Sequence, residues 1–174
     1  MSGIPLAALV RAVPDFPKPG IVFRDVGPLL ADAAAFEAAI AGMCAPWRRA
    51  APEYVCGIES RGFIFGAAMA RALGCGFAPI RKPGKLPGPV LVQGYSLEYG
   101  EDRLELQKDA LPLGARVLLV DDVLATGGTL LAAAALLEQA GARLCGASVL
   151  IELSALGGRG RWATSAPLES VLRF

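Results

Sequence analysis

The sequence of 174 residues contains no histidine. This absence excludes the Ser-His-Asp and Cys-His pairs that activate nucleophiles, and it excludes every zinc site that depends on histidine. The 17 lysines and arginines nearly balance the 16 acidic residues, so a net charge of +1 provides no general attraction for nucleic acid or an anionic membrane. Binding sites must therefore come from local groups of residues.

Cysteine is scarce, and long hydrophobic runs are missing. The four cysteines form neither a C-x-x-C pair nor a disulfide framework, so we expect buried, reduced thiols at Cys44, Cys56, Cys75 and Cys145. The N-terminal segment lacks the basic stretch of a secretory signal. The longest run without a charged residue, 123–137, is shorter than the roughly 20 apolar residues that cross a bilayer. These features predict a cytoplasmic protein that binds no membrane.

The chain does contain enough apolar residues for one sizeable core. Hydrophobic residues make up 54% of it and charged residues 19%, which excludes disorder and predicts a single domain over residues 1–174. Glycine and proline separate apolar segments whose patterns alternate between strand and helix. This order predicts an α/β fold, with a doubly wound, mainly parallel sheet flanked by helices. The predicted strands are 54–59, 77–80, 90–99, 103–108, 116–121 and 144–153; the predicted helices are 4–13, 33–49, 62–73 and a last one that stops at Gly141.

Residues 117–129, VLLVDDVLATGGT, contain the best buried-strand pattern of the sequence. Two adjacent acids stand at the end of this predicted strand, and a glycine-rich turn comes after them. The acids accept hydrogen bonds, which suits two neighbouring sugar hydroxyls. The turn precedes a helix, whose N-terminal amides bind phosphate, and its glycines allow close approach. A response-regulator receiver also pairs acids at a strand end, but near its first strand. The string therefore predicts a ribose 5-phosphate site formed by Asp121, Asp122, Ala125, Thr126, Gly127, Gly128 and Thr129.

The same string resembles the motif with which type I phosphoribosyltransferases bind 5-phosphoribosyl 1-diphosphate (PRPP). Further segments, at 16–25, 59–66, 80–89 and 95–111, resemble in order those of the adenine-specific branch of this family. The resemblance implies the type I phosphoribosyltransferase fold, with a small hood to which residues 1–32 contribute and a mobile hairpin loop. It also implies a purine salvage enzyme that acts as a homodimer and transfers the phosphoribosyl group from PRPP to adenine, giving AMP and diphosphate.

The segment between Glu59 and Glu98 contains no acidic residue but several cations. Arg61 lies in a tight turn after a predicted strand, and residues 81–89 form a loop stiffened by prolines. Such cations bind the charge of a leaving diphosphate. We therefore expect the diphosphate site to comprise Ser60, Arg61, Arg81, Lys82 and Lys85, whereas Arg71, in mid-helix, is expected to be solvated surface charge. The resemblance further implies a cis peptide bond between Glu59 and Ser60, and Mg²⁺ that arrives bound to PRPP and has few direct protein ligands.

For adenine, the resemblance implies Phe23 and Leu153 on opposite faces of the base, where stacking contributes about 1 to 3 kcal/mol. Backbone groups of Val22 and Arg24 would then read the base edge. A carbonyl there accepts from the 6-amino group of adenine and leaves a 6-oxo purine unpaired, which gives specificity. Phe23 as an ordinary core residue remains the alternative.

The catalytic residues implied by the resemblance are Glu98, Tyr99 and Arg61. Without a histidine, Glu98 would handle the purine proton and Tyr99 would position PRPP or the leaving group. Two other functions stay open: transfer to another purine, such as xanthine or guanine, and a PRPP-binding regulator on the same fold. Such regulators carry an additional DNA-binding module, which we do not expect in a chain of this length.

Overall fold

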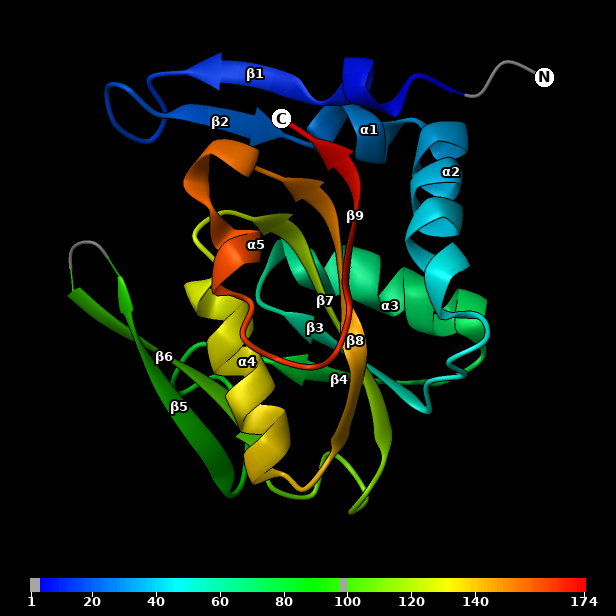
Figure 1. Ribbon diagram of the computed structural model, residues 1–174, viewed down its shortest axis with the longest axis vertical. Coiled ribbons are helices and arrows are strands. Elements are labelled where there is room, and N and C mark those ends of the chain that lie inside the picture. Colours follow the sequence, from blue (N-terminus) through cyan, green and yellow to red (C-terminus); the bar gives the residue numbers. More distant parts are fainter. Residues whose placement is uncertain (1–3, 98–99) are drawn as a thin grey trace. The chain divides into compact units, whose positions relative to one another are not determined.

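The computed structural model describes residues 4–97 and 100–174, with the backbone alone at residues 96, 97, 100 and 101. The chain forms two compact units, one ending at Gly42 and one spanning Met43–Phe174 (Figure 1). The expectation of a single domain over 1–174, with residues 1–32 in a hood, stays a prediction.

The first unit contains a small antiparallel hairpin. Strand β1 (Arg11–Pro14) pairs with β2 (Val22–Asp25), after the short 3-10 helix η1 (Leu6–Leu9). The predicted helix over 4–13 is therefore wrong. An apolar segment this short is marginal as an isolated helix, whereas strand pairing satisfies its backbone and adds an ion pair, with Arg11 Nη2 2.5 Å from Asp25 Oδ2. Helices α1 (Gly27–Ala31) and α2 (Ala33–Cys44) follow; α2 ends earlier than predicted, at the 3-10 helix η2 (Ala45–Trp47), which contains a proline.

The second unit is built on a parallel sheet of five strands in the order β4-β3-β7-β8-β9. This confirms the predicted mainly parallel α/β fold. Its strands are β3 (Tyr54–Ile58), β4 (Gly76–Ile80), β7 (Arg116–Leu124), β8 (Arg143–Glu152) and β9 (Leu168–Arg173), and its long helices are α3 (Arg61–Leu73) and α4 (Gly128–Gln139).

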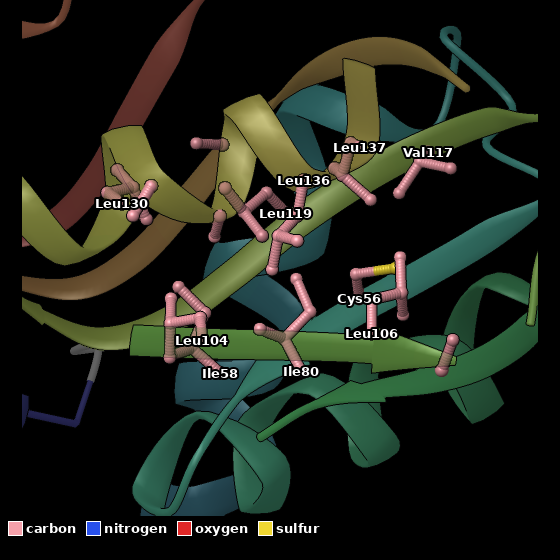
Figure 2. Close-up of a cluster of buried hydrophobic side chains, with 14 of the residues drawn as sticks. Cys56, Ile58, Ile80, Leu104, Leu106, Val117, Leu119, Leu130, Leu136 and Leu137 are labelled. Atoms are coloured by element: carbon pink, nitrogen blue, oxygen red, sulfur yellow. The ribbon is translucent and has the colours of Figure 1, made fainter. Parts of the chain in front are cut away.

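Alternate residues of β3 point to the two faces of this sheet. Gly57 faces α3, since its Cα lies 3.2 Å from where a Cβ at Gly66 would be. Cys56 and Ile58 face the other way, into the cluster that α4 covers with Leu130, Leu136 and Leu137 (Figure 2). The helices therefore lie on opposite faces, as a doubly wound sheet requires.

The predicted hairpin is also present. Strand β5 (Val90–Leu97) pairs antiparallel with β6 (Gly100–Gln107), and β6 begins three residues before the predicted strand 103–108. Leu104 and Leu106 are fully buried against the α4 side of the sheet (Figure 2). These two side chains fix the base of the hairpin to the sheet.

The four cysteines are all reduced, as expected, but only two are buried. Cys44 and Cys56 lie in the core, whereas Cys75 and Cys145 are half-buried, which corrects the prediction. Cys75 follows the glycine that ends α3, and Cys145 lies near the start of β8, so both occupy the margins of the packed layers. Among the described residues, no helix has the length and hydropathy needed to span a membrane.

The C-terminal strand β9 was not predicted. It follows the 3-10 helix η3 (Ser154–Leu156) and the short helix α5 (Gly158–Arg161), and it is held to β8 by Glu152. This carboxylate is 6% exposed and accepts hydrogen bonds from Arg159 Nε at 2.9 Å and Ser170 Oγ at 2.7 Å. The hydrogen bonds from Arg159 are the main reason why the pKa of Glu152 falls to about 2.

Glu152→Gln is expected to lower the free energy of unfolding at pH 7 by up to about 3 kcal/mol. A depressed carboxyl pKa stabilises the fold above the unfolded value near 4.5, and this stability is lost as the pH falls toward 2. The difference between the two proteins should therefore shrink over that interval in urea titrations. Glu138→Gln, at an exposed position on α4, is the control. A constant difference down to pH 2 would contradict the assignment.

Candidate active site

The two acids of the 117–129 string lie beside the residues that follow β3. Strands β3 and β7 are parallel neighbours, with Gly57 opposite Val120, so their carboxyl ends meet at one edge. There Arg61 Nε lies 2.8 Å from Asp122 Oδ2, and the backbone amide of Asp122 donates to Asp121 Oδ1 at 2.8 Å. The sheet topology thus brings Arg61 of α3 onto the acid pair.

Asp122 is buried, and Asp121 beside it is half-buried. Burial is the main reason why the pKa of Asp121 lies well above its usual range, and the neighbouring charge of Asp122 raises it further. Burial also raises the pKa of Asp122, against the lowering effect of Arg61. Asp121 packs closely against the start of α3, where a Cβ at Gly62 would lie 2.9 Å from Asp121 Oδ1. Two desolvated acceptors of this kind suit neutral hydroxyl donors.

A pocket of about 360 Å³ opens over these groups. A smaller one, of about 70 Å³, adjoins it at the glycine-rich turn and is lined in part by Thr126 and Gly127. The structure therefore brings most of the predicted ribose-phosphate and diphosphate residues together. The larger pocket is lined by Glu59, Ser60, Arg61, Lys82, Tyr95, Asp121, Asp122, Val123, Ala125 and Thr129.

The glycine-rich turn leads directly into α4, which begins at Gly128. Gly127 precedes it with a φ of 85°, in the left-handed region that favours glycine. A Cβ at Gly127 would lie 2.9 Å from the carbonyl oxygen of Gly158. Backbone conformation and space thus both require glycine here, and the first amides of a 12-residue helix are left for an anion.

The predicted diphosphate cations are all paired with acids of the chain itself. The Glu59 carboxylate accepts hydrogen bonds from Arg81 Nε at 3.2 Å and from the backbone amide of Lys82 at 2.8 Å. It also forms an ion pair with Lys85 Nζ. Burial alone would raise the pKa of Glu59, but these partners lower it. Arg81 and Lys85 do not line the 360 Å³ pocket, unlike Ser60, Arg61 and Lys82. The diphosphate set is therefore only partly brought together.

The hairpin supplies partners for Lys82 that the sequence analysis missed. Lys82 Nζ lies 3.0 Å from the hydroxyl of Tyr95 and contacts Asp102, whose Oδ2 also accepts from that hydroxyl at 3.0 Å. Burial alone would lower the pKa of Lys82, but the bonds to Asp102 and Tyr95 raise it. These partners come from another sheet, so nothing in the local sequence indicates them.

The remaining predicted residues stand as follows. The peptide bond between Glu59 and Ser60 is cis, which confirms the expectation. Arg71 is exposed in the last turn of α3, as expected of surface charge. Glu98 and Tyr99 lie outside the described residues. Val22, Phe23 and Arg24 belong to β2 of the first unit and Leu153 follows β8 in the second, so their shared role in binding adenine stays a prediction.

Comparison with known proteins gives a consistent result. The family described as the phosphoribosyl transferase domain matches residues 30–163. The adenine phosphoribosyltransferase of Xanthomonas campestris pv. campestris (strain B100) is 57% identical over 165 residues, covering 95% of this chain and 89% of the relative. That of Synechococcus sp. (strain JA-3-3Ab) is 56% identical over 168 residues and covers 96% of each.

Solved structures of adenine phosphoribosyltransferases are also similar to this chain. The adenine phosphoribosyltransferase of Rhodothermus marinus superimposes with a TM-score of 0.93 at 46% identity, over 97% of this chain and 96% of that one. The enzyme of Saccharomyces cerevisiae, complexed with an imino-altritol bisphosphate and adenine, gives 0.91 at 40% identity, over 96% of each chain.

Proposed function

The chain belongs to the phosphoribosyl transferase family, and we propose that it transfers the 5-phosphoribosyl group of PRPP to adenine, forming AMP and diphosphate in purine salvage. The observation that carries this function is the joint placement of the acid pair and the helix-capping glycine turn beside adjoining pockets. That arrangement suits a sugar with a terminal phosphate, and near-full-length adenine-specific relatives indicate the base.

In this reaction a purine nitrogen forms a bond to C1 of the ribose while the bond from C1 to the diphosphate oxygen breaks. The diphosphate takes the electron pair, and the purine proton must leave. Residues 125–129 hold the 5-phosphate with backbone amides and threonine hydroxyls, and Asp121 and Asp122 accept from the ribose hydroxyls. The sugar is thereby fixed for an in-line exchange at C1.

Stabilising the leaving diphosphate is the task of Ser60, Arg61 and Lys82, which line the same pocket. Arg81 and Lys85 lie on the adjoining loop and reach Glu59, so they act on the diphosphate only after exchanging that partner.

We further propose that Mg²⁺ enters with PRPP and neutralises charge on the diphosphate oxygens. The described residues contain no group of three or more histidine, cysteine, aspartate or glutamate side chains that could hold a metal. The two pocket carboxylates, Asp121 and Asp122, fit a hard cation that a substrate carries, directly or through water. The readout of this proposal is activity with and without added Mg²⁺.

For the base, we retain Phe23 and Leu153 as the stacking residues, with Val22 and Arg24 as the backbone that reads its edge. Glu98 is proposed to take the purine proton, and Tyr99 to position PRPP. Both follow from the resemblance of the YSLEYG segment to the adenine branch.

The oligomeric state and the cellular location complete the proposal. A homodimer follows from the family resemblance, and a cytoplasmic location is consistent with four unpaired cysteines. Light scattering on the purified protein tests the first.

Incubation with PRPP, Mg²⁺ and each of adenine, guanine, hypoxanthine and xanthine is expected to yield nucleotide efficiently with adenine alone, because only adenine carries a 6-amino donor and no 6-oxo group. Chromatography of the products measures this. Turnover of a 6-oxo purine without adenine turnover would establish the alternative transferase. PRPP binding without any turnover would establish the regulator.

A further inference from the structure

The segment between β8 and β9 packs directly on the phosphate-binding turn. Gly158 is buried, and a Cβ there would lie 2.2 Å from the carbonyl oxygen of Ala125 and 3.0 Å from the amide nitrogen of Gly127. Gly158 does not adopt a positive φ, so its missing side chain reflects space and not backbone conformation. The contact is reciprocal, because a Cβ at Gly127 would meet Gly158. The turn therefore rests on the backbone at Gly158.

Arg159, the next residue, fixes this segment to the sheet. Its Nε and Nη2 donate to the two oxygens of Glu152 at 2.9 and 2.7 Å, which is a bidentate pair. Its Nη1 donates to the carbonyl oxygen of Leu168 at 2.6 Å. One side chain thus ties α5 to the end of β8 and the start of β9 at once.

Glu152 in turn lies close to the origin of the phosphate turn. It pairs with Leu124 in the register of β7 and β8, and the amide of Leu153 donates to the carbonyl oxygen of Leu124 at 2.9 Å. Leu124 immediately precedes Ala125. The pair of Glu152 and Arg159 thereby closes a ring of contacts from the end of β7, through β8 and α5, back to the turn at Gly127.

We propose that Arg159, acting through Gly158, is a positioning residue that holds residues 125–127 in the conformation that binds the 5-phosphate of PRPP. This role rests on the proposed function. It differs from simple stabilisation of β9, because it predicts an effect on ligands that carry the sugar phosphate and none on the base.

The first test compares Arg159→Met with Arg173→Met. Arg173 also approaches Glu152, at 3.3 Å, but its side chain is 63% exposed and does not adjoin Gly158 in sequence. Arg159→Met is expected to raise the KM for PRPP about tenfold or more and to leave the KM for adenine within about twofold of wild type. Arg173→Met should leave both values unchanged. A KM for PRPP that stays at the wild-type value, or both KM values rising equally, would overturn the proposal.

The second test does not depend on the ion pair and decides the question if Arg159→Met fails to fold. Gly158→Ala places a methyl group against the turn, whereas Gly160→Ala, two residues on, meets open space. Calorimetry with ribose 5-phosphate is expected to show about tenfold weaker binding for the first variant only, with binding of inorganic diphosphate unaltered in both. Equal ribose 5-phosphate affinities would refute the positioning role.

These readouts separate the two levels of inference. A wild-type protein that makes no AMP disproves the proposed function, but ribose 5-phosphate binding by the glycine variants still tests the turn. Wild-type activity with an unaltered Gly158→Ala variant disproves only the role of this segment.

Discussion

Asp121→Asn is expected to lower kcat/KM for AMP formation by more than about 100-fold and to raise the midpoint of thermal unfolding. The activity falls because a carboxylate accepts hydroxyl hydrogen bonds more strongly than an amide does. Bonds to charged groups contribute about 1.5 to 3 kcal/mol each, and two of them account for a change of this size.

The gain in stability follows from the direction in which folding shifts the pKa of Asp121. Burial and Asp122 raise the pKa of Asp121 in the folded protein, so folding favours the protonated form. The stability that this group contributes is present below its unfolded pKa and is lost as the pH rises through the folded value. Above the unfolded pKa, this preference for the protonated form therefore costs folding free energy. A neutral asparagine removes that cost while keeping the Oδ1 that accepts from the Asp122 amide.

Thermal unfolding at several pH values measures this effect. The advantage of Asp121→Asn should be greatest near neutral pH and disappear in acid, where wild-type Asp121 is itself protonated. Asp109→Asn, the same chemical change at an exposed position, should alter neither activity nor stability. A less stable Asp121→Asn variant at pH 7 would show that the charged acid supports the fold.

Gly127→Ala is expected to reduce kcat/KM by about 100-fold, mainly through a higher KM for PRPP. A left-handed conformation costs a residue with a Cβ about 1 to 2 kcal/mol, and here the methyl group would also lie 2.9 Å from the Gly158 oxygen. The turn must therefore shift, and its amide N–H groups then no longer point toward the phosphate.

Gly74→Ala is the matched control for this change. Gly74 has a φ of 71° at the end of α3, and a Cβ there meets no atom within 4 Å. It carries the same conformational cost without the clash, so it should lose stability but keep its KM for PRPP. Steady-state kinetics and urea denaturation distinguish the two; matching KM values would mean that the position of the turn does not control binding.

The parts that sequence patterns predicted are those set by local periodicity. Strand β7 and the start of α4 follow from an apolar run, two acids and two glycines that stand together in the chain. The hairpin of β1 and β2 was missed because the short segment 4–13 carries an apolar pattern that a helix would also fit. Pairing with β2 decided its structure, and the paired residues lie 8 to 14 positions apart in the sequence.

The site was predicted in the same uneven way. Asp121 and Asp122 were recognised because they end a strand, but the roles of Glu59 and Asp102 were not. Glu59 gathers cations from a loop that follows the next strand, and Asp102 reaches Lys82 from the separate hairpin sheet. Such partners are set by tertiary packing, which a scan for acids within one segment does not detect.

The pairing of every proposed diphosphate cation with an acid has a consequence for affinity. Arg61 lies against Asp122, Lys82 against Asp102, and Arg81 and Lys85 against Glu59. A diphosphate entering this site competes with carboxylates that the protein already supplies, so its binding energy is a difference between two sets of ion pairs. The same carboxylates can reclaim their cations when the product departs, which favours turnover over tight retention.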